Sequence, residues 1–210
     1  SDVYKRQEIH NSAYMTLEQV IDVIKSAEHE GKMTVRLHTG DPSLYGAIRE
    51  QMDRLDELGI KYDICPGVSS FCGAAAALRA EYTLPDVSQT VIITRMAGRT
   101  PVPEKESIAA LAAHNATMVI FLSTGLLKEL SAELIRGGYK PDTPAAIVYK
   151  ASWADQKVCR CTVEDLAQTA SDNGITKTAL ICVGYFLGND YSLSKLYDKS
   201  FETEFRKAEI

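Results

Sequence analysis

The sequence predicts an α/β fold with two domains. Hydrophobic residues make up 45% of the 210 residues, which is enough for a substantial core. Short apolar runs rich in β-branched residues alternate with segments whose apolar residues recur every three or four positions, the patterns of buried strands and amphipathic helices. Glycine or proline follows many of these segments, as in strand–turn–helix connections. This alternation favours parallel β–α–β units.

The first part of the chain contains three predicted helices and two predicted strands. Thr16 is a suitable N-cap for the first helix, and Gly31 is a suitable end. Ser43 is the expected N-cap of the second helix, which would end near residue 58. The strands are expected at 33–37 and 60–65, and the third helix from Ser69 or Ser70 to residue 80.

A second set of elements follows the segment 82–88, YTLPDVS, whose proline and polar residues interrupt the alternation. We therefore expect an N-terminal domain over 8–88, a C-terminal domain over 89–188 and a polar tail over 189–210. The expected strands are 91–94, 118–122, 145–150, 157–161 and 180–186, with 145–150 and 157–161 paired. The expected helices are 105–114, 126–135 and one capped by Thr162 that runs to about 171.

Composition and charge exclude several classes of function. The net charge is −5, which argues against nucleic acid as a partner. No apolar run approaches the ~20 residues that cross a bilayer, so we expect no membrane partner. The five cysteines are scattered without a CxxC pair, which favours a reducing, cytoplasmic setting and gives no basis for a metal site.

The segment 38–46, HTGDPSLYG, is the first candidate for a ligand-binding loop. It lies between a predicted strand and a predicted helix, and ligands in open α/β sheets bind at the carboxyl ends of strands. Gly40 can adopt a positive φ, and Asp41 can accept hydrogen bonds from nearby backbone amides. An ordinary turn with Asp41 as its cap is the alternative.

Four separated segments in this order resemble the tetrapyrrole methylase family. They are HTGDPSLYG at 38–46, PGVSS at 66–70, VSQT at 87–90 and TRMAGRTP at 94–101, and the resemblance runs from about residue 11 to 207. It implies a two-domain fold, with an N-terminal parallel-sheet domain and a C-terminal mixed α/β domain. It also implies a homodimer that uses S-adenosylmethionine to methylate ring carbons of a tetrapyrrole. The TRMAGRTP block resembles the branch that methylates carbon 11 of precorrin-4, or its cobalt form, in cobalamin biosynthesis.

The resemblance also implies site residues. Those expected beside the cofactor are Gly40, Asp41, Leu44, Tyr45, Ser69, Ser70, Phe121, Leu122, Tyr149, Thr178, Ala179 and Leu180. Those expected to bind substrate carboxylates are Arg95, Arg99 and Lys150, because cationic side chains suit carboxylates. Core burial is the alternative for Leu122 and Leu180, and surface solubility is the alternative for the three cations. No catalytic acid or base is assigned.

The start of the chain departs from the family pattern. Residues 1–7, which contain DVYKRQ, read as the translation of a sequencing-library adapter, so we expect them to be a scar rather than native sequence. Family members begin with a strand and a GxGPGDP loop, and nothing in 1–33 matches it. We therefore expect that this strand and loop are missing; a divergent native N-terminus is the alternative.

Three rival functions remain at this point. One is a methylase of the same fold that acts on another corrin intermediate or on uroporphyrinogen III. Another is a nucleotide-binding oxidoreductase, which should show GxGxxG between a strand and a helix, and this sequence has none. The third is a non-catalytic remnant that has lost part of its cofactor loop.

Overall fold

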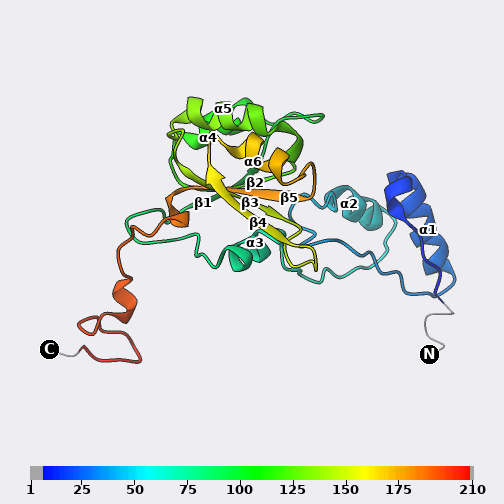
Figure 1. Cartoon of the computed structure of the whole chain (residues 1–210). Helices are drawn as coiled ribbons and strands as arrows, with labels where there is room; N and C mark the ends of the chain where they lie inside the picture. Colours follow the sequence, from blue (N-terminus) through cyan, green and yellow to red (C-terminus); the bar gives the residue numbers. More distant parts are fainter. Residues whose placement is uncertain (1–6, 209–210) are drawn as a thin grey trace. The chain divides into compact units, whose positions relative to one another are not determined.

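The computed structural model describes residues 7–208, so the expected adapter segment falls almost wholly outside the described residues. The chain divides into two compact units, the first ending at Ser69 and the second beginning at Ser70 (Figure 1). The third predicted helix therefore belongs to the second unit. The domain boundary expected after residue 88 stays a prediction.

The first unit contains two helices that pack through a small apolar core. Helix α1 spans Leu17–His29, and the Thr16 hydroxyl accepts from the backbone of Gln19 while the Gln19 side chain accepts from the backbone of Thr16. This reciprocal capping box confirms the predicted start. Helix α2 spans Arg49–Glu57. The buried residues that join them are Val20, Ile21, Ile24 and Leu55.

The predicted strands at 33–37 and 60–65 are wrong. Both segments are irregular, and within residues 7–69 no strand is formed. Their apolar side chains are left in solvent: Val35 is 68% exposed and Ile64 51%. A strand of a parallel sheet needs ladder partners beside it and cover on both faces, and the described residues of this unit supply neither. The parallel sheet expected for the N-terminal part is thus absent from these residues.

The second predicted helix begins later than expected. Tyr45 and Ala47 have φ values of 57° and 50°, which are left-handed and incompatible with a helix. Ser43, the expected N-cap, instead donates its backbone and hydroxyl hydrogens to the Asp41 carboxylate. The loop therefore continues to Ile48, and α2 starts at Arg49.

A five-stranded mixed sheet forms the centre of the second unit. The strand order is β1-β2-β5-β3-β4. β1 and β2 are parallel, whereas β5 runs antiparallel to both β2 and β3, and β4 runs antiparallel to β3. The bounds are Val91–Arg95 for β1, Thr117–Phe121 for β2, Pro144–Tyr149 for β3, Lys157–Thr162 for β4 and Ala179–Val183 for β5. The paired strands expected at 145–150 and 157–161 are confirmed, but only β1 and β2 form the parallel pairing that alternation favours.

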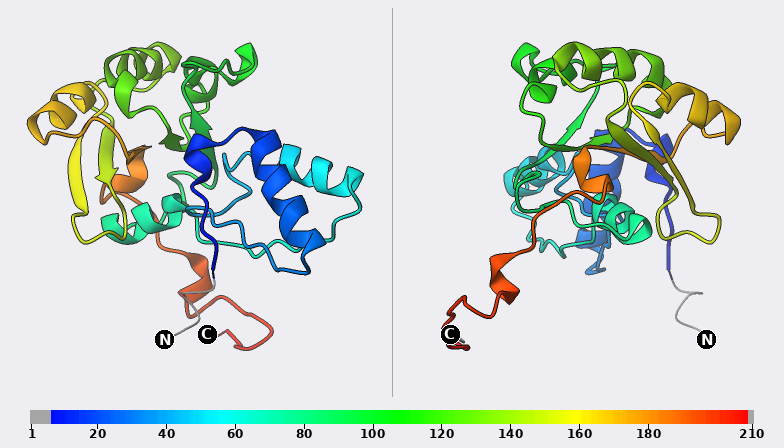
Figure 2. Two further views of the ribbon diagram at one scale, coloured as in Figure 1. Left: turned by 90° about the vertical axis from the view of Figure 1, so that its right-hand side faces the viewer. Right: turned by 60° about the vertical axis from the view of Figure 1, so that its left-hand side comes forward.

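Helices cover both faces of this sheet. Helices α4, α5 and α6 lie on one face and α3 on the other, as Figure 1 and the two views of Figure 2 show. Their bounds are Ser70–Leu78 for α3, Ile108–Ala112 for α4, Leu127–Gly137 for α5 and Leu166–Asp172 for α6. The mixed α/β architecture expected for this part of the chain is therefore confirmed.

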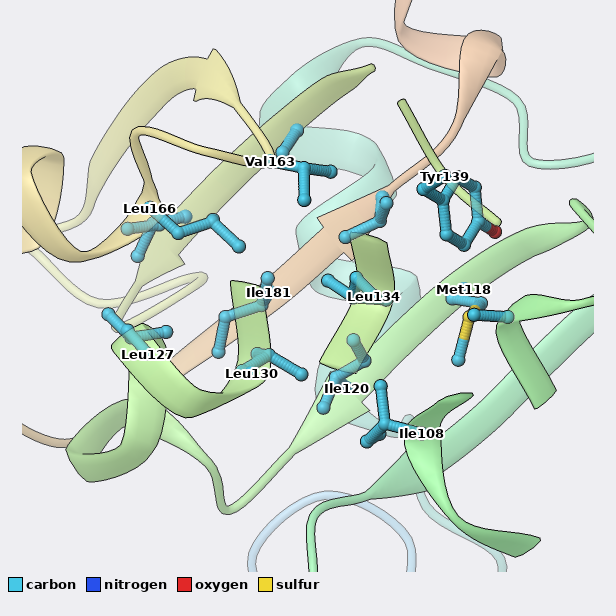
Figure 3. Close-up of a cluster of buried hydrophobic side chains, with 14 of the residues drawn as sticks. Ile108, Met118, Ile120, Leu127, Leu130, Leu134, Tyr139, Val163, Leu166 and Ile181 are labelled. Atoms are coloured by element: carbon cyan, nitrogen blue, oxygen red, sulfur yellow. The ribbon is translucent and has the colours of Figure 1, made fainter. Parts of the chain in front are cut away.

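The side chains of each central strand alternate between two cores. Met118 and Ile120 of β2 point into the cluster beneath α4, α5 and α6, which Figure 3 shows together with Leu130 and Ile181. Val119, between them, packs in the cluster on the α3 side. All three are fully buried. Because successive side chains of a strand point to opposite faces and both faces of this sheet are covered, consecutive residues of the strand are apolar.

Two helix starts in the second unit differ from expectation. Helix α4 begins only at Ile108, because the Ser107 hydroxyl caps it by accepting from the backbone of Ala110. Helix α6 begins at Leu166, and Thr162 does not cap it. Thr162 is the last residue of β4 and donates its hydroxyl hydrogen to Asp165 instead. The final strand ends at Val183, since Gly184 has a φ of 141° and turns the chain.

Candidate functional site

One edge of the sheet in the second unit gathers most of the predicted site residues. β1, β2 and β3 all end at this edge, and β5 begins there because it is antiparallel to β2 and β3. Arg95 at the end of β1 is paired with Phe121 at the end of β2. Tyr149 at the end of β3 is paired with Ala179 at the start of β5. Residues far apart in the sequence are thus neighbours along one row, which we call the strand-end edge.

The backbone at the strand-end edge is strained. Leu122, Lys150 and Thr178 follow β2, follow β3 and precede β5, and their φ values are 53°, 46° and 57°. Residues other than glycine seldom adopt this left-handed region, and such strain collects at functional sites. The Lys150 amide donates to the Thr178 carbonyl at 3.0 Å, which joins two of these turns. These strained turns therefore lie at residues that the family resemblance implies as part of the site.

Two hydroxyl side chains that are not among the predicted site residues hold this edge together. Ser123 is fully buried; its hydroxyl donates to the Phe121 carbonyl at 2.7 Å and accepts from the Met96 amide at 2.9 Å. The Thr124 hydroxyl donates to the Ala179 carbonyl at 3.2 Å. Their sequence signal is a serine and a threonine directly after a buried strand, where orphan backbone groups need partners.

The predicted cofactor residues at this edge differ in what they expose. The Leu122 side chain is 72% exposed although it directly follows a buried strand, so core burial does not explain it. Leu180, in contrast, is 5% exposed and packs in the core on the α3 side with Val148. Its side chain belongs to the core. Ser70 is exposed at the start of α3.

The ammonium of Lys150 already has partners. It forms an ion pair with Asp155 and lies 5.0 Å from the Tyr149 ring centroid and 5.3 Å from that of Trp153. The hydrogen bond from Lys150 lowers the pKa of Asp155, and the same bond raises the pKa of Lys150. A substrate carboxylate would have to share this ammonium with Asp155, and Trp153 is placed to report such a change.

The first unit contains a separate group of predicted residues around Asp41. One Asp41 oxygen accepts from the Gly67 amide at 2.8 Å and the other from the Ser43 amide at 2.8 Å. The bonds from Ser43 come first, and that from Gly67 next, in lowering the pKa of Asp41 below its usual range. Asp41 therefore joins the GDPSLYG and PGVSS segments. It is a cap of its own turn and a link to a second loop, so the turn-cap alternative accounts for only part of its contacts.

Glycine is required where these two loops meet. A side chain on Gly67 would collide with the Gly40 carbonyl oxygen, and one on Gly46 would collide with that of Pro42. Gly40 has a φ of 68°, as its predicted turn requires. Of the other residues expected here, Leu44 is half-buried, Tyr45 is 45% exposed and Ser69 is buried.

The donor set suits an organic cofactor. Among residues 7–208 no three His, Cys, Asp or Glu side chains converge as a metal site would need. No helix in that range is long and apolar enough to cross a membrane. The strand-end edge of the second unit offers backbone groups in strained turns and the exposed apolar side chain of Leu122, which suit a flat, partly apolar ligand. The Asp41 loops of the first unit, taken by themselves, offer backbone turns and an ionised carboxylate, which suits a positively charged group.

Comparison with known proteins places the chain in a family. The family model for tetrapyrrole (corrin/porphyrin) methylases matches residues 1–167. A cobalt-precorrin-4 C(11)-methyltransferase from Methanocaldococcus jannaschii is 56% identical over 205 residues, which cover 97% of this chain and 79% of that protein. The protein of the same name from Priestia megaterium is 49% identical over 95% of this chain and 79% of its own length.

A solved structure agrees with these relatives. The X-ray structure of a cobalamin biosynthetic enzyme, cobalt precorrin-4 methyltransferase, matches with a TM-score of 0.85 and 48% sequence identity. The match covers 87% of this chain and 76% of that one. The family model alone spans well over half of the sequence, and the relatives are similar along nearly all of it. The chain therefore belongs to the tetrapyrrole (corrin/porphyrin) methylase family.

Proposed function

We propose that this protein is an S-adenosylmethionine-dependent methyltransferase that methylates carbon 11 of precorrin-4 or cobalt-precorrin-4 in cobalamin biosynthesis. The observation that carries this proposal is the similarity, along nearly the whole chain, to relatives with that printed name. The strand-end edge supports it, because the residues that the family resemblance implies are neighbours there.

The reaction needs positioning more than it needs acid or base groups. S-adenosylmethionine supplies a methyl group that is already activated by its sulfonium. The ring carbon provides the electron pair for the new C–C bond, the C–S bond breaks, and its electrons stay on the sulfur of the departing S-adenosylhomocysteine. The positive charge that the sulfonium brought leaves the methylated ring as a proton, which solvent accepts. The tasks left to the protein are to align the two reactants and to exclude water. This agrees with a site built from backbone turns and apolar side chains.

Individual residues have distinct proposed roles. The turns at Leu122, Lys150 and Thr178 present backbone groups and, at Leu122, an apolar side chain to the cofactor. The ionised carboxylate of Asp41 favours a positive charge near its loop, and its lowered pKa keeps it ionised at neutral pH. Arg99 and Lys150 provide positive charge for substrate carboxylates.

Two further proposals concern the setting of the enzyme. The cysteines among residues 7–208 are all free, which supports a reducing, cytoplasmic location. A homodimer is the assembly that the family resemblance implies, and light scattering on the purified protein measures it directly. A measured molar mass equal to that of one subunit would contradict the dimer but would leave the proposed chemistry unaffected.

The proposed activity is tested with isotopically labelled cofactor. The protein is incubated with S-adenosylmethionine that carries a 13C methyl group and, in parallel, with cobalt-precorrin-4, precorrin-4 and uroporphyrinogen III. We expect one labelled methyl on carbon 11 of one or both precorrin-4 forms. Label on another carbon, or a preference for uroporphyrinogen III, would assign the protein to a different branch of the family. No transfer to any of the three would leave the non-catalytic alternative.

A further inference from the structure

The two arginines of the TRMAGRTP segment are in different states. Arg95 turns its guanidinium back onto the loop that follows β1, residues 96–101. One terminal nitrogen donates to the carbonyls of Met96 at 3.2 Å and Thr100 at 3.1 Å, and the other donates to that of Pro101 at 2.8 Å. The side chain is only partly exposed. A guanidinium engaged in this way has few donors left for a substrate.

The same loop is held at its base from the neighbouring strand end. The Met96 amide donates to Ser123, whose hydroxyl is in turn fixed on the Phe121 carbonyl. Within the loop the Gly98 amide donates to the Thr100 carbonyl at 3.2 Å. Arg95 and Ser123 thus fix the start and the end of the loop, and together they determine its shape.

Arg99 lies on this loop, and its positive charge has no partner within the described part of the chain. The residue is exposed, and within residues 7–208 its guanidinium forms no hydrogen bond or ion pair. Because Arg95 is paired with Phe121, the loop leaves the sheet at the strand-end edge beside Leu122. A free arginine on a fixed loop at that edge is suited to bidentate contact with a carboxylate.

We propose that the two arginines divide their work: Arg95 is a positioning residue that orders the 96–101 loop, and Arg99 is the residue of this pair that binds a substrate carboxylate. The inference rests on the proposed function, which supplies a macrocycle with many carboxylates as the ligand. The physical reason for the division is preorganisation. A loop that is ordered before the substrate arrives does not lose its freedom on binding, so more of the contact energy remains as affinity.

Variants that keep or remove charge separate the two roles. Lysine keeps the charge of arginine but cannot donate to three carbonyls from a planar fork. In Arg95→Lys and Arg95→Gln alike we expect amide exchange at 97–100 to become at least ~tenfold faster and the KM for cobalt-precorrin-4 to rise. Ser123→Ala loosens the same loop without touching either charge, so it should also speed exchange there.

The Arg99 variants should weaken substrate binding without changing exchange in the loop. Arg99→Gln should raise the KM for cobalt-precorrin-4 at least ~tenfold, and Arg99→Lys should restore part of the loss, while exchange at 97–100 stays as in the wild type. Affinity for S-adenosylhomocysteine should be unchanged in both. Thermal unfolding of every variant identifies any that fails to fold.

Different results overturn different parts of the proposal. Slow exchange and an unchanged KM in Arg95→Lys would mean that Arg95 acts through its charge and not through the loop. An unchanged KM in Arg99→Gln would remove Arg99 as a ligand. A wild-type protein that methylates no tetrapyrrole would contradict the proposed function and, with it, the role of Arg99. The exchange measurement would still decide whether Arg95 orders the loop.

Discussion

Asp41 carries the clearest prediction among single residues. Its two oxygens accept from the amides of Ser43 and Gly67, so it holds two motif loops together. We expect Asp41→Asn to lower the affinity for S-adenosylhomocysteine nearly as much as Asp41→Ala, because an amide NH2 would face one of those donors. Calorimetry measures the change, with the exposed Asp22→Asn as a matched control. Equal affinity in wild type and Asp41→Asn would reduce Asp41 to a turn residue.

The pH dependence of the same loop follows from the lowered pKa of Asp41. A carboxyl whose pKa is depressed in the folded state adds stability above its unfolded pKa and loses it as the pH falls through the folded value. Since the ordinary value is 3.8 and the folded one lies below it, amide protection at Gly67 should be constant from pH 7 to pH 5. It should decline only in stronger acid. A decline near neutral pH would point to a different titrating group.

Substitution of Ser123 tests the hydrogen bonds that its hydroxyl forms at the strand-end edge. Ser123→Ala removes the acceptor of the Met96 amide in a fully buried position, and an unsatisfied buried amide costs ~1–3 kcal/mol. We expect a loss of unfolding free energy in that range by denaturant titration. The control is Ser171→Ala, an exposed serine at the end of α6, which should stay within ~0.5 kcal/mol. Equal losses in the two variants would contradict the role of Ser123.

At the scale of elements, identical residue types in the two units should differ in what they contribute. Ile181 in β5 is fully buried, whereas Ile64 lies 51% exposed in a segment that forms no strand. Ile181→Ala should cost ~2–5 kcal/mol of unfolding free energy, and Ile64→Ala should stay within ~0.5 kcal/mol. A large loss in Ile64→Ala would mean that the 60–65 segment is packed as a strand after all.

The same contrast explains how far the sequence predicts the elements. The run at 118–122 is apolar at every position, which by itself indicates a buried strand. In the structure this strand is covered on both faces. The segment 33–37, MTVRL, alternates apolar with polar residues, which also suits a strand, but a strand needs ladder partners as well, and these are non-local and leave no mark in the segment itself. Periodicity likewise placed a helix start at Ser43, since the left-handed backbone of Tyr45 and Ala47 is not visible in it.

For the candidate site, the sequence indicates which residues take part but not how they contact one another. The family resemblance implies Phe121, Leu122, Tyr149 and Thr178 one by one, and the placement of β5 between β2 and β3 brings these residues to one end of the sheet. The sequence could not show that the Arg95 guanidinium is used by its own loop, because those carbonyl partners exist only once the loop has folded. The sequence therefore predicts the same role for both arginines, Arg95 and Arg99.

At the scale of the whole molecule, a buried cysteine thiol and two buried tyrosine hydroxyls set an upper limit on the pH range in which the protein is stable. Burial raises the pKa of the Cys182 thiol from 9.0 to about 12, and burial raises the pKa of Tyr82 and Tyr139 as well. A raised pKa means that stability is intact below pH 9 and is lost as the pH rises towards the folded value. Cys182 alone should lower the unfolding free energy by up to ~1.4 kcal/mol per pH unit in that interval.

Denaturant titrations from pH 8 to pH 11 measure this slope. The variant Cys182→Ala should be less stable at pH 8 but lose stability with pH less steeply than the wild type, by about one proton. Thiol-reactive probes provide a second check, because Cys65 and Cys72 are exposed and Cys182 is buried. The first two should react in the native protein, and Cys182 only on unfolding. Identical slopes in wild type and variant would mean that Cys182 does not titrate differently in the two states.

The cofactor contact that we propose lies at the strand-end edge of the sheet in the second unit. Amide hydrogen exchange of the full chain, with and without S-adenosylhomocysteine, tests this contact. We predict that the ligand slows exchange around Leu122, Lys150 and Thr178, the three strained turns at that edge, and leaves the helices α5 and α6 unchanged. Saturating ligand with no added protection at any of these turns, and protection elsewhere instead, would contradict the assignment of the site.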